Sequence, residues 1–174
     1  MRVLAIDPAL RNTGFAVIEE TAAASGRRRQ RAVAYGVIEN PRALRQSGCL
    51  VAIRERLVEV IRDHSPEVCA VEGVIYVQSY RTAITMGAAR GAALLAAAEH
   101  GMEIYEYAPK RVKQAVVGRG AADKQQVAFM MRALLGLSET PPPDAADALA
   151  IGLAHCYAAD PLRASALVDR PVPL

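Results

Sequence analysis

The 174-residue chain lacks the cysteine pairs, long apolar runs and leader-type N-terminus that are typical of secreted and membrane proteins. Its three cysteines, Cys49, Cys69 and Cys156, form no Cys-x-x-Cys pair. They predict neither a disulfide framework nor a zinc site, and we expect them to be buried. The longest apolar stretch, 86–98, is shorter than the ~18–20 residues of a membrane span and contains Arg90. We therefore expect a cytoplasmic protein without a membrane partner.

Several catalytic motifs are also missing. The chain contains no Gly-x-Ser-x-Gly, no Walker-type lysine loop and no Gly-x-Gly-x-x-Gly. These absences exclude a serine hydrolase, a P-loop NTPase and a dinucleotide-dependent enzyme. A strong charge of one sign is missing too, since the chain has 21 Lys and Arg residues and 18 Asp and Glu residues. The net charge of +3 is too small to identify a polyanionic partner by itself.

What is present is the composition of one globular domain. Hydrophobic residues make up 52% of the chain and charged residues 22%, which excludes a disordered, collagen-like or coiled-coil protein. A domain of this length buries about 70% of its unfolded surface, so it needs no disulfide or metal for stability. We expect a single domain over residues 1–158 and a flexible tail over 159–174.

The order of apolar patterns predicts an α/β fold with a five-stranded mixed sheet. The expected strands are 2–6, 14–19, 32–38, 67–71 and 103–107, and the expected helices are 42–64, 79–99, 109–118, 123–136 and 144–158. The first three strands follow one another as hairpins, with a polar loop over 21–30. A right-handed crossover through the first helix makes the fourth strand parallel to the first, with helices on both faces of the sheet.

Four carboxylates fall where this topology brings them together. Asp7 and Glu72 follow the first and fourth strands, and parallel neighbours have their carboxyl ends at the same edge of a sheet. Asp144 and Asp147 lie one turn apart at the start of the last helix. Such a cluster repels itself unless divalent cations neutralise it, and oxygen ligands suit Mg²⁺ or Mn²⁺. Two ions ~3.5–4 Å apart can support phosphodiester hydrolysis.

Each carboxylate also has a simpler explanation when it is taken alone. Asp144 and Asp147 are typical of a helix N-terminus, where caps and the helix dipole favour acidic residues. Asp7 before Pro8 is typical of a turn. Glu72 is harder to explain in this way, because it follows an apolar strand and is expected to be partly buried.

Basic residues cluster around one glycine-rich turn and fit the same class of substrate. Lys110 and Lys113 share one face of the helix after Pro109, and Lys124 follows a glycine-rich turn at 118–120. These lysines could hold nucleic-acid phosphates, although a solvated lysine face explains any one of them equally well. A second basic group, at 27–31, is interpreted as a solvated loop.

An ordered string of motifs carries a resemblance that covers residues 2–157. The motifs are Ile6-Asp7-Pro8 with Thr13-Gly14, Val71-Glu72, Gly87-Ala-Ala-Arg-Gly91, Glu106-Tyr107-Ala108, 112–118, Asp123-Lys124 and 144–150. In these residues the chain resembles the RuvC family of Holliday-junction resolvases. The resemblance implies a ribonuclease-H-like fold and a homodimer that resolves four-way DNA junctions by paired symmetric nicks. It also implies two Mg²⁺ or Mn²⁺ ions per active site, ligatable 5′-phosphate and 3′-hydroxyl ends, and RuvA and RuvB as branch-migration partners.

The resemblance also implies roles for individual residues. The metal-binding and catalytic carboxylates would be Asp7, Glu72, Asp144 and Asp147; Lys113 would be catalytic, and Lys113, Lys124, Tyr76 and Arg81 would contact DNA. The chain departs from the family at Ala9 and Leu10, where many members have Gly-Ser. It also has Ile75 where relatives carry an aromatic residue that stacks on a junction base, and the adjacent Tyr76 is expected to replace that contact.

Three other functions are compatible with parts of this pattern. A junction-binding dimer without chemistry would keep the fold, but four carboxylates without metals would only reduce its stability. An actin-like ATP-binding domain normally needs a much longer, two-lobed chain. A ribonuclease acting on RNA–DNA hybrids would share both fold and metals, and only the family resemblance favours junctions over hybrids.

Overall fold

The computed structural model describes residues 1–22, 28–74, 79–160 and 173–174. In these residues the strands are β1 (Arg2–Asp7), β2 (Asn12–Ala22), β3 (Arg28–Glu39), β4 (Val68–Glu72) and β5 (Glu103–Tyr107). The helices are α1 (Gln46–His64), α2 (Tyr80–Ala98), α3 (Pro109–Val117), α4 (Lys124–Leu135) and α5 (Pro143–Ala159).

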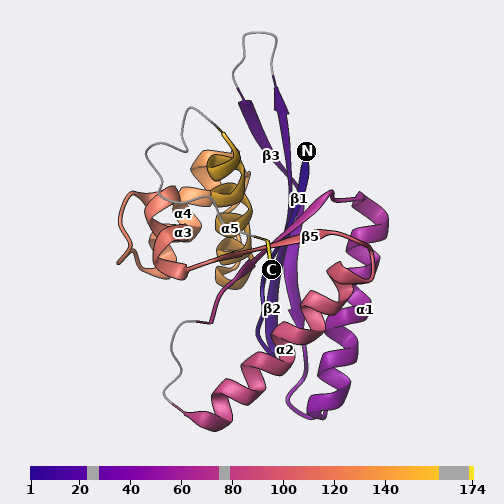
Figure 1. Ribbon diagram of the computed structural model, residues 1–174. Helices are drawn as coiled ribbons and strands as arrows, with labels where there is room; N and C mark the ends of the chain where they lie inside the picture. Colours follow the sequence, from indigo (N-terminus) through magenta and orange to yellow (C-terminus); the bar gives the residue numbers. More distant parts are fainter. Residues whose placement is uncertain (23–27, 75–78, 161–172) are drawn as a thin grey trace.

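The strands form one mixed sheet in the order β3-β2-β1-β4-β5 (Figure 1). β1, β2 and β3 are antiparallel neighbours, whereas β4 is parallel to both β1 and β5. Ile6 pairs with Val71, so the next residues, Asp7 and Glu72, end adjacent strands at one edge of the sheet. The predicted five-stranded sheet and the predicted parallel crossover are therefore confirmed.

Helices cover both faces of the sheet, as expected. α1 and α2 lie on one face, and α3, α4 and α5 lie on the other (Figure 1). The side chains of β1 alternate between two buried clusters: Leu4 and Ile6 face the α1–α2 side, and Val3 and Ala5 face α5. Most of α5 is buried, which fixes this helix along the centre of the sheet.

Two of the predicted local features are wrong. α1 begins at Gln46 instead of residue 42, because residues after Pro41 form a turn in which the Leu44 amide donates to the Pro41 carbonyl (3.0 Å). The basic group at 28–31 is not a solvated loop, since β2 and β3 extend through it. Arg28 pairs with the buried Glu20 at 2.6 Å and Arg31 with Glu19 at 2.7 Å. Arg27 lies outside the described residues.

The cysteines are free and buried, as expected. Within the described part of the chain, no helix combines the length and apolar character needed to cross a bilayer. α5 ends at Ala159, and the predicted tail falls mostly on residues 161–172, which lie outside the described residues. The last residues return to the sheet, where the Leu174 amide donates to the Ile104 carbonyl at 2.9 Å.

Candidate active site

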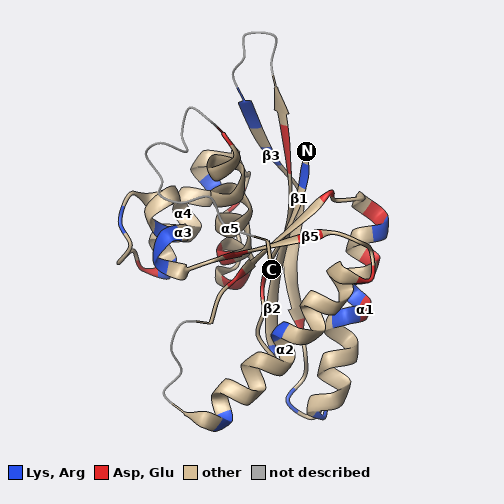
Figure 2. Ribbon diagram, viewed as in Figure 1, with Lys and Arg blue, Asp and Glu red and all other residues tan. Residues whose placement is uncertain are grey.

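Three aspartates meet where β1 ends and α5 begins. One carboxylate oxygen each from Asp7, Asp144 and Asp147 lies within 4.8 Å of the others, and all three residues are partly buried. Figure 2 shows the acidic residues of α5 at its N-terminal end, with basic residues of α3 nearby. The predicted meeting of a strand end with the start of the last helix is therefore present in the structure.

Gly14 makes this meeting sterically possible. It is the β2 partner of Asp7, and a Cβ atom added to it would lie 2.0 Å from the Asp144 carbonyl oxygen. The first turn of α5 therefore packs directly on the β2 backbone, beside Asp7. A sequence alone does not reveal this role, because it depends on which helix docks over the glycine; the only signal was its place in the family motif.

Glu72 adjoins the three aspartates through Asp7. The Asp7 and Glu72 carboxyl groups share a hydrogen bond, although Glu72 is outside the 4.8 Å group found among the described residues. Burial, followed by the charge of Asp7, raises the pKa of Glu72 to about 8. Burial, followed by the charge of Asp147, raises the pKa of Asp7 to about 6. Burial is therefore the first cause of both raised pKa values, and repulsion between neighbouring carboxylates is the second.

Helix capping does not explain the α5 aspartates. Pro142 occupies the N-cap position, Pro143 opens the helix, and no side-chain hydrogen bond caps it. Asp144 lies in the first turn, as the helix-dipole explanation expects, but neither aspartate caps the helix. Burial is the largest influence on Asp147, and it raises the pKa of that carboxyl. Both aspartates instead pair with a lysine from another helix.

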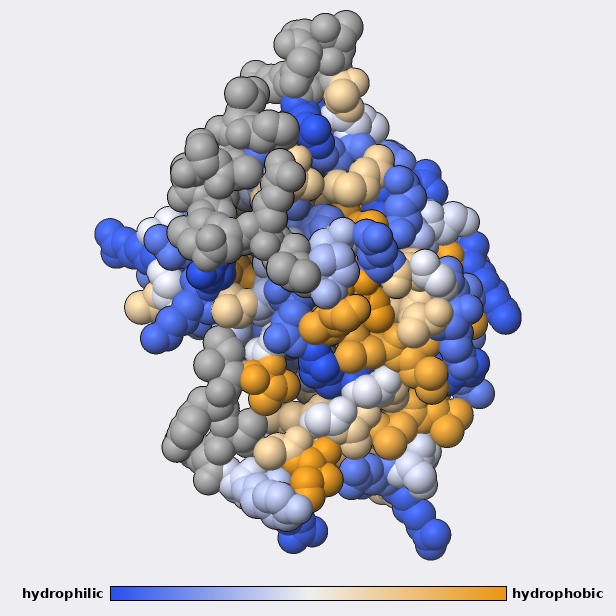
Figure 3. All heavy atoms as spheres, viewed as in Figure 1, coloured by the Kyte–Doolittle hydropathy of each residue, from blue (hydrophilic) through white to orange (hydrophobic). Residues whose placement is uncertain are grey.

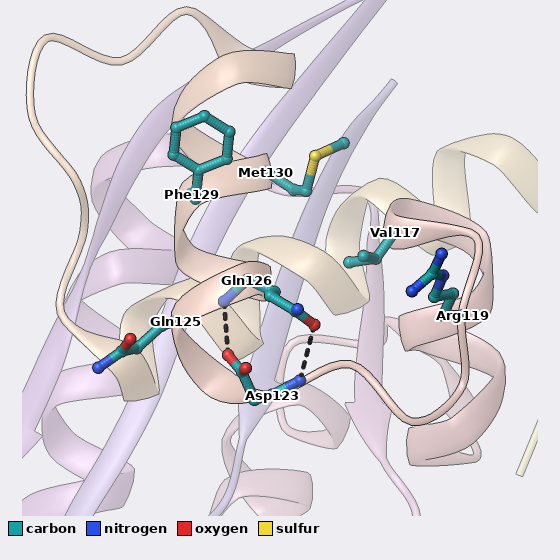
Figure 4. A pocket seen from close by; sticks show the side chains of 7 residues that line it. All are labelled: Val117, Arg119, Asp123, Gln125, Gln126, Phe129 and Met130. Atoms are coloured by element: carbon teal, nitrogen blue, oxygen red, sulfur yellow. Dashed lines mark hydrogen bonds between the residues drawn. The ribbon is translucent and has the colours of Figure 1, made fainter.

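That lysine is Lys124, the first residue of α4. Its Nζ lies 3.5 Å from Asp144 Oδ1 and 3.3 Å from Asp147 Oδ2. Burial acts to lower the pKa of Lys124, but the charges of Asp147 and Asp144 raise it overall. A capping box fixes the start of α4: the Gln126 amide donates to Asp123 Oδ1 at 2.8 Å, and the Asp123 amide donates to Gln126 Oε1 at 3.2 Å (Figure 4).

The other residues expected to bind DNA differ in their positions. Lys113 on α3 is partly buried, and its charge acts to lower the pKa values of Glu72 and Asp147, which places it beside the cluster. Arg81 is exposed in the first turn of α2. Tyr76 and Ile75 lie outside the described residues.

A pair of residues that the sequence analysis did not single out supports the strand end at Glu72. The Glu106 carboxyl packs on Gly73, where an added Cβ would lie 2.9 Å from it, and Arg90 of α2 forms an ion pair with Glu106. The Gly73 amide also donates to the Tyr107 carbonyl at 2.9 Å. Both Arg90 and Glu106 belong to the family motifs, which was the available signal.

A separate groove of about 560 Å³ lies beside this site, along α4 and the end of α3 (Figure 4). It is lined by Val117, Arg119, Asp123, Gln125, Gln126, Phe129 and Met130. Neither the three clustered aspartates nor Glu72 lines it. The candidate active site is therefore the acidic cluster, whose carboxylate oxygens can bind cations and which has Lys113 and Lys124 beside it.

The family model described as crossover junction endodeoxyribonuclease RuvC matches residues 3–155. The chain belongs to the RuvC family. The crossover junction endodeoxyribonuclease RuvC of Akkermansia muciniphila is 60% identical over 94% of this chain and 95% of its own. The RuvC of Bradyrhizobium diazoefficiens is 46% identical over 90% of this chain and 87% of its own.

Solved structures agree with this membership. The Thermus thermophilus RuvC structure superposes with a TM-score of 0.82 at 35% identity and covers 100% of both chains. T. thermophilus RuvC in complex with a Holliday junction substrate gives a TM-score of 0.84 at 35% identity, covering 100% of this chain and 99% of that one. These matches confirm the expected ribonuclease-H-like fold.

Proposed function

We propose that the protein is a metal-dependent endodeoxyribonuclease that resolves four-way DNA junctions by paired symmetric nicks. The observation that carries this proposal is the cluster of Asp7, Asp144 and Asp147 in a chain of the RuvC family. A T. thermophilus member of that family has been solved with its Holliday junction substrate. That substrate supports a role in DNA recombination and repair, which we place in the cytoplasm as part of the proposal.

The carboxylates fit divalent metal ions. Hard ions such as Mg²⁺ and Mn²⁺ prefer oxygen ligands, and Asp7, Asp144 and Asp147 bring theirs within 4.8 Å of one another. The raised pKa values of Asp7 and Glu72 reflect burial and mutual repulsion that a cation would relieve. We therefore assign Asp7, Glu72, Asp144 and Asp147 as ligands of two ions, which would activate a water molecule and stabilise the departing oxygen.

The chain's own residues would bind and orient the DNA strand. Lys113 lies beside the carboxylates and would contact the scissile phosphate, while Lys124, Arg81 and Tyr76 would contact the DNA. In the reaction, a water oxygen forms a bond to phosphorus and the bond from phosphorus to the 3′ oxygen breaks. The products are a 5′-phosphate and a 3′-hydroxyl, which a ligase can rejoin.

A homodimer would present two such sites to the two opposed strands. α2 carries an exposed apolar stripe that includes Tyr80 (84% exposed), Ile84 (52%) and Leu95 (49%). Gly87 and Gly91 lie on the same helix. Among the described residues, a Cβ added at either would meet no atom within 4 Å apart from its chain neighbours and the adjacent backbone of its own helix. Figure 3 shows apolar residues gathered over this part of the surface. These features support α2 as the dimer contact. The proposal that RuvA and RuvB are partners rests on the family resemblance alone.

A comparison of three substrates tests the proposal. The purified protein is incubated with a labelled four-way junction, a linear duplex and an RNA–DNA hybrid, each with Mg²⁺, Mn²⁺ or EDTA. We expect paired, ligatable nicks in the junction alone, and only with metal. Cleavage of the hybrid alone would identify a ribonuclease, and tight junction binding without nicks under either metal would identify a non-catalytic junction-binding dimer.

A further inference from the structure

We propose that Lys124 is the counter-ion of the aspartate cluster in the DNA-free protein, and that a divalent ion must displace it. Until DNA binds, Lys124 would therefore weaken the affinity of the cluster for metal. The inference rests on the proposed metal-dependent function and adds to it an order of events. Lys124 would have two successive partners, first the aspartates and then a DNA phosphate.

The first step is that the ammonium group shares its partners with the metal. Lys124 Nζ lies 3.3–3.5 Å from one oxygen each of Asp147 and Asp144. Those two residues, together with Asp7, are the ones whose oxygens gather within 4.8 Å. An ion bound by them would lie only a few ångströms from the ammonium if Lys124 stayed in place. Like charges at that distance repel, so binding of one cation disfavours the other.

The second step is that Lys124 can leave without disturbing the fold. Its side chain is 61% exposed, so the ammonium has solvent access. Its backbone is held separately by the reciprocal hydrogen bonds between Asp123 and Gln126. A lysine joins a compact charge to a flexible four-carbon stem, so the ammonium can move while the start of α4 stays fixed.

The third step is the coupling to substrate. A DNA phosphate beside α4 would attract the ammonium away from the aspartates, which would raise the affinity of the cluster for metal. Coupling between two binding events is reciprocal, so metal bound to the aspartates would also favour the contact between Lys124 and DNA. The free protein would then hold metal weakly, and full loading would follow binding of DNA.

Metal binding to the DNA-free protein tests this inference without any measurement of cleavage. We would titrate Mn²⁺ into wild type, Lys124→Met and Arg132→Met, and follow the free ion by electron paramagnetic resonance. Arg132→Met removes the same charge from the exposed far end of α4 and serves as the control. We expect Lys124→Met to bind Mn²⁺ about tenfold more tightly, a difference of about 1.4 kcal/mol, and Arg132→Met to match wild type.

Unchanged or weaker binding by Lys124→Met would overturn the inference, as would equal tightening in Arg132→Met. Lys124→Gln, with a polar side chain of similar length, replaces the Met variant if circular dichroism shows that the latter is unfolded. Asp144→Asn separates this result from a failure of the proposed function. If Asp144→Asn binds Mn²⁺ as wild type does, the aspartates are not the metal site and both proposals fail; if binding is lost there, the Lys124 comparison decides the inference alone.

Discussion

Replacing Gly14 by alanine should separate Asp144 from Asp7. The new Cβ would lie 2.0 Å from the Asp144 carbonyl oxygen and 2.7 Å from its carbonyl carbon, and both are backbone atoms that cannot rotate away. Real Cβ contacts are essentially never shorter than 3.0 Å, so β2 and the start of α5 must move apart by about 1 Å. Because Gly14 pairs with Asp7 across β1 and β2, this movement falls within the acidic cluster.

The two consequences differ in size. Overpacking of this kind typically costs about 1–3 kcal/mol of the free energy of unfolding, which lowers the Tm by several degrees. A displacement of about 1 Å in a catalytic constellation can cost on the order of 100-fold in rate. We therefore expect Gly14→Ala to remain folded at 25 °C while its junction cleavage falls about 100-fold.

Gly152→Ala is the matched control for this prediction. Gly152 lies on the same helix, where an added Cβ would be 3.1 Å from the side chains of Ala5 and Ile18. It follows Asp147 by five residues and Asp144 by eight, which is about 1.4 and 2.2 helical turns. The assay is single-turnover cleavage of a labelled four-way junction with Mg²⁺, alongside thermal unfolding. Gly152→Ala should lose stability but keep most of its rate. Wild-type cleavage by Gly14→Ala, or equal loss of rate in both variants, would refute the argument.

The remaining predictions concern pH and assembly. Burial raises the pKa of Glu72 to about 8 and that of Asp7 to about 6. The folded metal-free protein therefore retains protons that the unfolded chain releases. Its Tm in EDTA should fall as the pH rises from 5 to 8. Glu72→Gln should flatten this slope, and a Tm that rises with pH would contradict the assignment. In sedimentation velocity, Ile84→Asp should be a monomer. The control Phe129→Asp, which changes an exposed residue of α4, should remain a dimer. A dimeric Ile84→Asp would exclude the α2 contact.

The sheet topology and the positions of Asp7 and Glu72 could be predicted, because they depend on general rules of strand connection. The crossover rule makes β4 parallel to β1, which is enough to place Asp7 and Glu72 at one edge of the sheet. The cap of α4 by Asp123 depends on residues three positions apart, so local sequence is sufficient.

The features that sequence could not provide depend on contacts between distant elements. Position 14 requires a glycine only because the first turn of α5 packs on its backbone, and no spacing in the chain predicts that contact. Lys124 was expected to hold a phosphate, but in the structure it pairs with aspartates some 20 residues away. A run of arginines is typical of a solvated loop, so the sequence predicts a loop at 28–31. In the structure these residues belong to β3, where Arg28 and Arg31 form ion pairs with glutamates of β2.

The most direct test of the central claim is to measure cleavage and binding of a four-way junction together for Asp7→Asn. This change removes a charged metal ligand but little volume, and Asp7 sits at the end of a buried strand. We predict that the variant binds the junction as wild type does and cleaves it at least about 1,000-fold more slowly with Mg²⁺ or Mn²⁺. Wild-type cleavage by a folded Asp7→Asn protein would contradict the assignment of this cluster as the nuclease site.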